Sequence, residues 1–83
     1  MVLFNKILIA NRGEIALRII RSAKELGITV AVVYAEREKH SKFVLEADEA
    51  YSLGNGTLHD TYLNIDKIIK IAILNQVEAI HPG

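Results

Sequence analysis

Two short runs of almost continuously apolar residues constrain the fold of this 83-residue chain more than any other feature. They are Lys6–Ala10 (KILIA) and Thr29–Tyr34 (TVAVVY). A strand with one face in water alternates apolar and polar residues, whereas a strand buried on both faces reads as a nearly continuous apolar run. Because helices cover both faces of a parallel sheet, these runs predict inner strands of an α/β domain.

Two weaker runs, Ala50–Leu53 and Val77–Ile80, bring the number of predicted strands to four. Between the strands lie three segments whose apolar residues recur with helical spacing, at 13–26, 41–47 and 64–75. Strands and helices therefore alternate along the whole chain. This order, with short connections, predicts a Rossmann-like α/β fold with an open parallel four-stranded sheet flanked by helices.

The ends of the helices and the core can also be predicted. Gly27 follows the last periodic residue of the first helix and is expected to stop it. Ser41 and Asn64 stand where N-caps belong in the second and third helices. The predicted core residues are Ile7, Ile9, Val30, Val32 and Ile80.

Composition excludes several classes of protein. Ten Lys and Arg residues balance ten Asp and Glu residues, which argues against nucleic acid or an anionic membrane as a partner. The chain has no Cys, so it has no disulfide framework. The apolar run at the N-terminus is split by Asn5 and Lys6 and does not resemble a signal peptide. We therefore expect a cytoplasmic protein.

Ligands of open parallel sheets bind beyond the carboxyl ends of the strands, where the segments 11–14, 35–40 and 81–83 are expected. The first of these turns lacks the G-x-G-x-x-G pattern, because Gly13 is its single glycine. Glu14 also places a negative charge where a phosphate would bind. Residue chemistry therefore favours a structural turn with a solvated Arg12, rather than a nucleotide site.

His81 comes directly before Pro82, at the end of the last predicted strand. A histidine in this place can be a general base or a ligand, but residue chemistry favours a partly buried side chain that is bonded to a backbone group. His40 and His59 lie in polar loops, and the three histidines lack ligand-like spacing. The sequence therefore predicts neither a metal site nor a catalytic residue in this chain.

Arg18, Arg21 and Glu25 stand at positions i, i+3 and i+7 of the first predicted helix and share one exposed stripe. Such stripes are usually solvated, because exposed ion pairs contribute only about 0–1 kcal/mol. A polar interface with another subunit is the alternative. Residue chemistry alone favours the solvated face.

The run Lys6–Arg21 (KILIANRGEIALRIIR) closely resembles the opening of biotin carboxylases. Three shorter blocks share the resemblance at matching spacing: 47–50 (ADEA), 62–65 (YLNI) and 79–83 (AIHPG). The similarity spans essentially the whole chain, and its first run is highly specific. The chain looks like the N-terminal domain of the biotin carboxylase part of acetyl-CoA, propionyl-CoA or pyruvate carboxylase, without indicating which acyl acceptor is used.

The resemblance implies an ATP-dependent ligase. Biotin carboxylases use MgATP and bicarbonate to carboxylate biotin on a biotin carboxyl carrier protein, and a carboxyltransferase uses the product. The domain is of the pre-ATP-grasp type, so the residues that bind ATP and Mg²⁺ are expected in later segments. Residues 1–83 also end directly after the fourth predicted strand. We therefore expect one domain of a longer chain, inactive when isolated.

The resemblance also assigns expectations to single residues. In the family, His81-Pro82-Gly83 leads into a run at the biotin side of the cleft, which places His81 and Gly83 at the cleft's edge. Arg18, Arg21 and Glu25 match positions at the homodimer interface of bacterial biotin carboxylases. The resemblance therefore implies a subunit interface for this stripe, in place of the solvated face that residue chemistry favoured. Two alternatives remain open at this point: the front domain of another ATP-grasp ligase, and a non-catalytic nucleotide-binding module.

Overall fold

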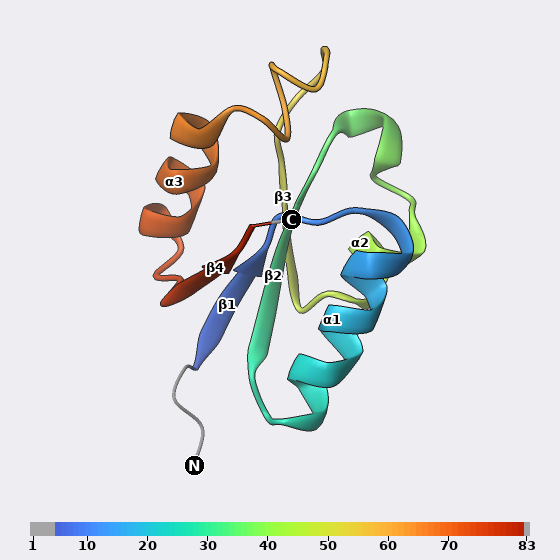
Figure 1. Ribbon diagram of the computed structural model, residues 1–83, viewed down its shortest axis with the longest axis vertical. Coiled ribbons are helices and arrows are strands. Elements are labelled where there is room, and N and C mark those ends of the chain that lie inside the picture. The colour runs from blue at the N-terminus through green and yellow to red at the C-terminus, as the bar shows by residue number, and fades with distance from the viewer. Residues whose placement is uncertain (1–4, 83) are drawn as a thin grey trace.

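The computed structural model describes residues 5–82, and in this part of the chain four parallel strands form one sheet (Figure 1). The strands are β1 (Lys6–Ile9), β2 (Thr29–Tyr34), β3 (Glu49–Ser52) and β4 (Ala79–His81). Their order in the sheet is β3-β2-β1-β4, and each neighbouring pair is parallel. The predicted open parallel sheet is therefore confirmed, with β1 and β2 inside and β3 and β4 at the edges.

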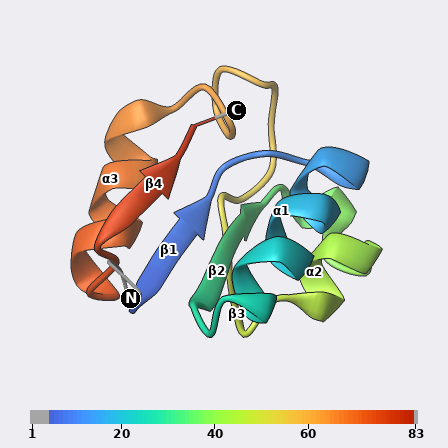
Figure 2. The same cartoon turned by 60° about the horizontal axis from the view of Figure 1, so that its bottom comes forward.

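Helices cover the two faces of the sheet (Figures 1 and 2). α1 (Gly13–Glu25) and α2 (Lys42–Glu46) lie on one face, and α3 (Ile65–Leu74) lies on the other. Right-handed crossovers explain this placement, because the chain moves in one direction from β1 to β3 and returns across the sheet to β4. A short 3₁₀ turn at Glu36–Glu38 follows β2 and was not predicted.

The core has one layer on each side of the sheet. On the α1 side, Ile9, Val30 and Val32 pack against Ile20 and Phe43. On the α3 side, a second cluster contains Leu8, Ala31, Val33, Leu53, Ile68 and Ala72. The predicted burial of Ile9, Val30 and Val32 is confirmed.

Two core predictions need correction. Ile7 is only partly buried. Ile80 was predicted to be buried but is 39% exposed. The reason is its position on β4, which pairs with β1 on one side and forms an edge of the sheet.

The helix ends follow the predictions in two cases out of three. Gly27 adopts a positive φ of 78° after α1, as a helix-stopping glycine does. The side chain of Asn64 accepts a hydrogen bond from the Lys67 backbone N–H at 3.1 Å. The predicted side-chain cap at Ser41 is wrong, because its backbone carbonyl accepts from Val44 and Leu45 while its hydroxyl makes no cap bond. None of the described helices is both long and apolar enough to cross a membrane.

Candidate functional site

The carboxyl ends of β1 and β4 lie side by side and bring together two residues that are 70 positions apart. The backbone N–H of Ala10 donates to the His81 carbonyl at 3.0 Å. The imidazole Nδ1 of His81 lies 2.9 Å from Asn11 Oδ1. Because an amide oxygen can only accept, Nδ1 of His81 is the donor in this contact.

This contact corrects the expectation for His81. Residue chemistry favoured a partly buried histidine bonded to a backbone group, but the side chain is exposed and its ring bonds to the side chain of Asn11. His81 therefore stands at the rim of the sheet with its orientation fixed by the first strand-to-helix turn. Gly83, the other predicted cleft residue, lies outside the described residues.

Arg12 is held in place beside Tyr62, although residue chemistry favoured a solvated side chain. Its guanidinium carbon lies 5.0 Å from the centroid of the Tyr62 ring, a cation–π geometry. Its Nε also lies 3.9 Å from Glu38 Oε2. The Arg12 side chain remains 44% exposed, so it is oriented by its neighbours but still accessible.

Tyr62, which lies against Arg12, is also hydrogen-bonded to the segment that follows β2. Its hydroxyl accepts a hydrogen bond from the backbone N–H of Ala35 at 3.1 Å and donates to Glu38 Oε1 at 2.8 Å. Burial, with a contribution from the nearby Glu38 carboxylate, raises the pKa of Tyr62 to about 12. The phenol therefore stays neutral at physiological pH and acts as a fixed hydrogen-bonding group.

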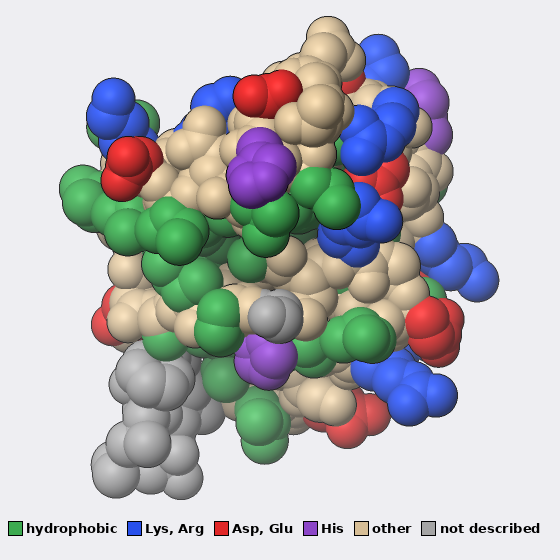
Figure 3. Space-filling model, turned by 45° about the horizontal axis from the view of Figure 1, so that its top comes forward, with side chains coloured by type: hydrophobic (Ala, Val, Ile, Leu, Met, Phe, Trp, Pro, Cys, Tyr) green, Lys and Arg blue, Asp and Glu red, His purple; other side chains and the backbone are tan. Residues whose placement is uncertain are grey.

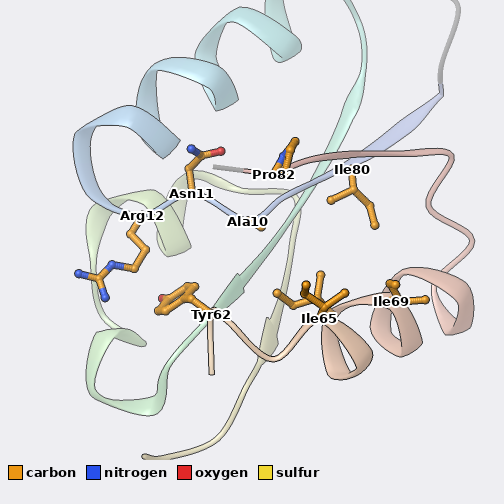
Figure 4. A pocket seen from close by; sticks show the side chains of 9 residues that line it. Ala10, Asn11, Arg12, Tyr62, Ile65, Ile69, Ile80 and Pro82 are labelled. Atoms are coloured by element: carbon orange, nitrogen blue, oxygen red, sulfur yellow. The ribbon is translucent and has the colours of Figure 1, made fainter. Parts of the chain in front are cut away.

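An open pocket of about 530 Å³ adjoins these residues. Arg12 and Tyr62 form one end, isoleucines of α3 form one wall, and Ile80 and Pro82 lie opposite (Figure 4). The space-filling view of this end of the molecule shows hydrophobic side chains gathered across the face, with charged groups mainly near its margins (Figure 3). The pocket is therefore suited to apolar groups.

The predicted stripe on α1 is exposed, and one of its three side chains has a partner on another helix. Arg18 lies 3.7 Å from Glu14 of the same helix and its side chain is 79% exposed. Arg21 donates through Nε and Nη2 to the two carboxylate oxygens of Glu46, at 3.3 and 3.1 Å. Glu25 is exposed. Arg21 therefore joins α1 to α2 within one chain.

The hydrogen bonds from Arg21 lower the pKa of the Glu46 carboxyl, and the same pair raises the pKa of Arg21. Sequence reasoning missed Glu46 as a partner because it lies 25 residues away on another helix. The sequence pattern contains no signal that links these two positions.

The chemistry available at the carboxyl edge is that of binding and positioning. Over residues 5–82, no group of three or more His, Asp or Glu side chains could hold a metal ion. Gly13 has a positive φ of 58° where the chain turns from β1 into α1. Glu14 follows it in the first turn of α1. The turn therefore offers a negative side chain where a phosphate would need positive charge.

Comparisons with known proteins identify the family. The family model "Biotin carboxylase, N-terminal domain" matches residues 3–83. The chain belongs to the biotin carboxylase family as its N-terminal domain. The resemblance and the fold class inferred from the sequence are both confirmed.

Individual relatives agree with this assignment. The chain is 49% identical over 81 residues to a pyruvate carboxylase subunit of Methanothermobacter thermautotrophicus, covering 98% of the chain and 16% of that protein. It is 52% identical to the 2-oxoglutarate carboxylase small subunit of Hydrogenobacter thermophilus, covering 98% and 17%. The chain thus spans about a sixth of the length of these relatives.

A solved structure shows the same fold. The biotin carboxylase domain dimer of the Hydrogenobacter thermophilus 2-oxoglutarate carboxylase, in complex with MgADP, ADP and bicarbonate, is similar with a TM-score of 0.92. It is 51% identical, and the match covers 100% of this chain and 18% of that one.

Proposed function

We propose that this chain is the N-terminal domain of a longer biotin carboxylase, which uses MgATP and bicarbonate to carboxylate biotin on a carrier protein. The observation that carries the proposal is the similarity over 98% of the chain to two carboxylase subunits named for different acceptors, pyruvate and 2-oxoglutarate. Because the two acceptors differ, a domain that both proteins share serves the reaction that precedes transfer to the acceptor. That reaction is the carboxylation of biotin. A carboxyltransferase then uses the carboxylated carrier. We also propose a cytoplasmic location, where ATP and bicarbonate are both available.

In this proposal the chain contributes a scaffold rather than the phosphoryl-transfer machinery. Positioned cations and metal ions supply most of the catalysis in phosphoryl transfer. The described residues include no cluster suited to a metal, and the first turn carries Glu14. ATP and Mg²⁺ therefore belong to segments beyond this chain, and the isolated domain is expected to be inactive.

We further propose that His81 and Gly83 border the biotin cleft in the longer protein. The hydrogen bond between Asn11 and His81 supports a positioning role, because it ties the end of β4 to the turn after β1. Residues 82 and 83 would then follow a strand end that is held in place by this hydrogen bond and by the pairing of β4 with β1.

A chimera tests the function. This chain would replace the matching segment of Bacillus subtilis biotin carboxylase 1, to which it is 49% identical. We expect the chimera to carboxylate biotin with ATP and bicarbonate at a rate within about tenfold of the parent, since about 1.4 kcal/mol of misfit corresponds to tenfold. The parent lacking this segment is the inactive control. A folded chimera without activity would contradict the proposal.

We also propose that Arg18, Arg21 and Glu25 lie at a homodimer interface. All three are exposed on one helix, and a related biotin carboxylase domain forms a dimer. Side chains that pair within the chain can also be covered by a second subunit. Losing one partner of a buried charge pair costs roughly 3–5 kcal/mol, so an interface charge is sensitive to reversal.

The test must separate contacts between subunits from the pair formed with Glu46. Arg21→Glu in the longer protein should raise the dimer dissociation constant at least about tenfold. The double variant Arg21→Glu/Glu46→Arg restores a pair within the chain and should leave the dimer weak. Lys70→Glu, at an exposed position of α3, is the control. An unchanged constant by sedimentation velocity, or full recovery in the double variant, would return Arg21 to a role within one chain.

A further inference from the structure

The loop between β3 and α3 contains the one asparagine–glycine pair of the chain, Asn55-Gly56. Both residues are exposed, and the loop projects from one end of the molecule (Figure 1). An asparagine can lose its side-chain amide without an enzyme when the next backbone nitrogen attacks its side-chain carbonyl carbon. Glycine has no Cβ to hinder that approach. The residue types at 55 and 56 therefore favour chemical modification.

The side chain of Asn55 is available for this reaction. Among the five asparagines of the chain, Asn11, Asn64 and Asn75 each use the side-chain amide in a hydrogen bond. Within residues 5–82, the structure shows no hydrogen bond of the side chains of Asn5 and Asn55. The fold therefore holds three of the five amides and leaves two to rotate.

The attacking nitrogen distinguishes these two remaining asparagines. The N–H groups that follow Asn5, Asn64 and Asn75 all donate to hydrogen bonds, which hold them away from the preceding side chain. The N–H of Gly56 makes no hydrogen bond with any part of the chain that the structure describes. Asn55 is therefore the one asparagine of residues 5–82 whose side chain and following N–H both lack a partner.

The contacts that hold this loop use carbonyl groups and leave the reacting atoms uncovered. The carbonyl of Gly54 accepts a hydrogen bond from the Glu36 N–H at 3.0 Å. The carbonyl of Gly56 accepts from Arg37 Nη1 at 3.2 Å. Both bonds connect the loop to the segment after β2. An extra backbone atom between residues 54 and 56 would therefore disturb this connection.

We propose that Asn55 is a site of spontaneous deamidation and isoaspartate formation. The Gly56 nitrogen bonds to Asn55 Cγ, and Nδ2 leaves as ammonia with the proton of the Gly56 N–H. Water then opens the five-membered imide. Opening at the side-chain carbonyl gives aspartate, whereas opening at the main-chain carbonyl gives isoaspartate, which adds one carbon to the backbone. Either product adds one negative charge to a chain whose formal net charge is zero.

The experiment incubates the whole natural protein in mildly alkaline buffer made with heavy-oxygen water. The heavy oxygen marks products that form before digestion, and peptide mass spectrometry follows each asparagine over time. We expect Asn55 to convert at least about tenfold faster than each of the other four asparagines of residues 1–83, with both aspartate and isoaspartate as products. Asn55→Gln is the matched control, because its side chain would need to form a six-membered ring, and it should remain unmodified.

A synthetic peptide of residues 51–61 gives the rate without the fold. Because the structure leaves the reacting groups uncovered, the rate in the folded protein should lie within about tenfold of the peptide rate. A larger protection by the fold, or conversion no faster than at the other asparagines, would overturn the inference. Aspartate without isoaspartate would also overturn it, since that product pattern indicates direct hydrolysis rather than an imide.

The effect on the loop is measured on the isoaspartate form, separated chromatographically from the aged protein. Asn55→Asp is its matched control, because that variant adds the same charge without the extra backbone carbon. We expect the isoaspartate form to unfold at a lower temperature than Asn55→Asp, which should unfold like the unmodified protein. Equal melting temperatures of the two forms would contradict the expected disturbance of the bonds at Gly54 and Gly56.

Discussion

Among single residues, Tyr62 connects the largest number of elements at the candidate site. We predict that Tyr62→Phe lowers the free energy of unfolding by about 1–3 kcal/mol, because the N–H of fully buried Ala35 loses its hydrogen-bond acceptor. Urea denaturation measures this change. Tyr34→Phe is the matched control, because Tyr34 is also partly buried and the structure shows no hydrogen bond of its hydroxyl within residues 5–82. Equal effects of the two variants would contradict the role of Tyr62.

The raised pKa of Tyr62 predicts that the folded state loses stability at alkaline pH. Burial raises the pKa of Tyr62 to about 12, above the ordinary value of 10.0. A raised pKa in the folded state means that its stabilising contribution is complete below pH 10 and is lost as the pH rises through about 12. The hydrogen bond to Glu49 also raises the pKa of Tyr51. A titration of phenolate absorbance should therefore be compared with that of Tyr62→Phe, in which the ionisation step at about 12 should be absent. A titration in which all tyrosines ionise together would be inconsistent with this environment.

Gly56 is a residue whose replacement should be costly. Its φ is 126°, and an added Cβ would lie 2.6 Å from Asp60 Oδ2 and 2.8 Å from Asp60 Cβ. Asp60 itself accepts hydrogen bonds from the backbone and hydroxyl of Thr57. We predict that Gly56→Ala destabilises the fold by roughly 1–3 kcal/mol. Thermal unfolding compares it with Asn55→Ala at the preceding exposed position, which should be close to wild type.

Contacts between side chains were the part of the site that the sequence could not predict. Asn11 and His81 were each placed at the carboxyl edge from the strand pattern, but their hydrogen bond depends on β4 pairing with β1 rather than with β3. Arg12 was expected to be solvated, because nothing in the sequence places Tyr62 below it. Local patterns contain no information on such distant pairs.

At the scale of elements, the two inner strands and the two longer helices were predictable. Continuous apolar runs mark β1 and β2 because both faces are covered, and regular spacing marks α1 and α3. The bounds and burial of the edge strands were predicted less accurately, since β3 begins one residue before the predicted run and Ile80 of β4 is exposed. A run of apolar residues cannot show which strand is at the edge.

The outer strand β3 is tied to β1 by an ion pair that should respond to acid. Lys6 Nζ lies 2.8 Å from Glu49 Oε2. Hydrogen bonds from Lys6, and then from Tyr51, lower the pKa of Glu49. A lowered pKa in the folded state means that the stabilisation is present above the unfolded pKa and is lost as the pH falls through the folded one.

A double-mutant cycle tests this prediction. The variants are Lys6→Met, Glu49→Gln and their combination, compared by urea unfolding at neutral pH and at a pH below the pKa of Glu49. We expect a coupling free energy of about 0.5–2 kcal/mol at neutral pH, because both side chains are partly buried, and little in acid. Coupling that is absent at neutral pH, or is unchanged in acid, would show that the pair does not connect the strands.

At the scale of the whole molecule, the arrangement of the sheet and helices gathers the candidate site at one edge and leaves an apolar pocket beside α3. The sheet, its strand order and its two helical layers explain why Asn11, Arg12, His81 and Pro82 meet at one edge. The pocket on the α3 face and the exposed stripe on α1 lie on opposite sides of the sheet. Contacts made by one of these surfaces therefore need not disturb contacts made by the other.

The most direct test of the central claim follows the transfer of isotopically labelled bicarbonate to biotin. The whole natural protein should produce acid-labile labelled carboxybiotin when ATP and Mg²⁺ are present, and none when either is left out. The isolated 83-residue chain should produce none under any of these conditions. A correctly folded whole protein that transfers no label, or a chain of residues 1–83 that does transfer it, would contradict the account.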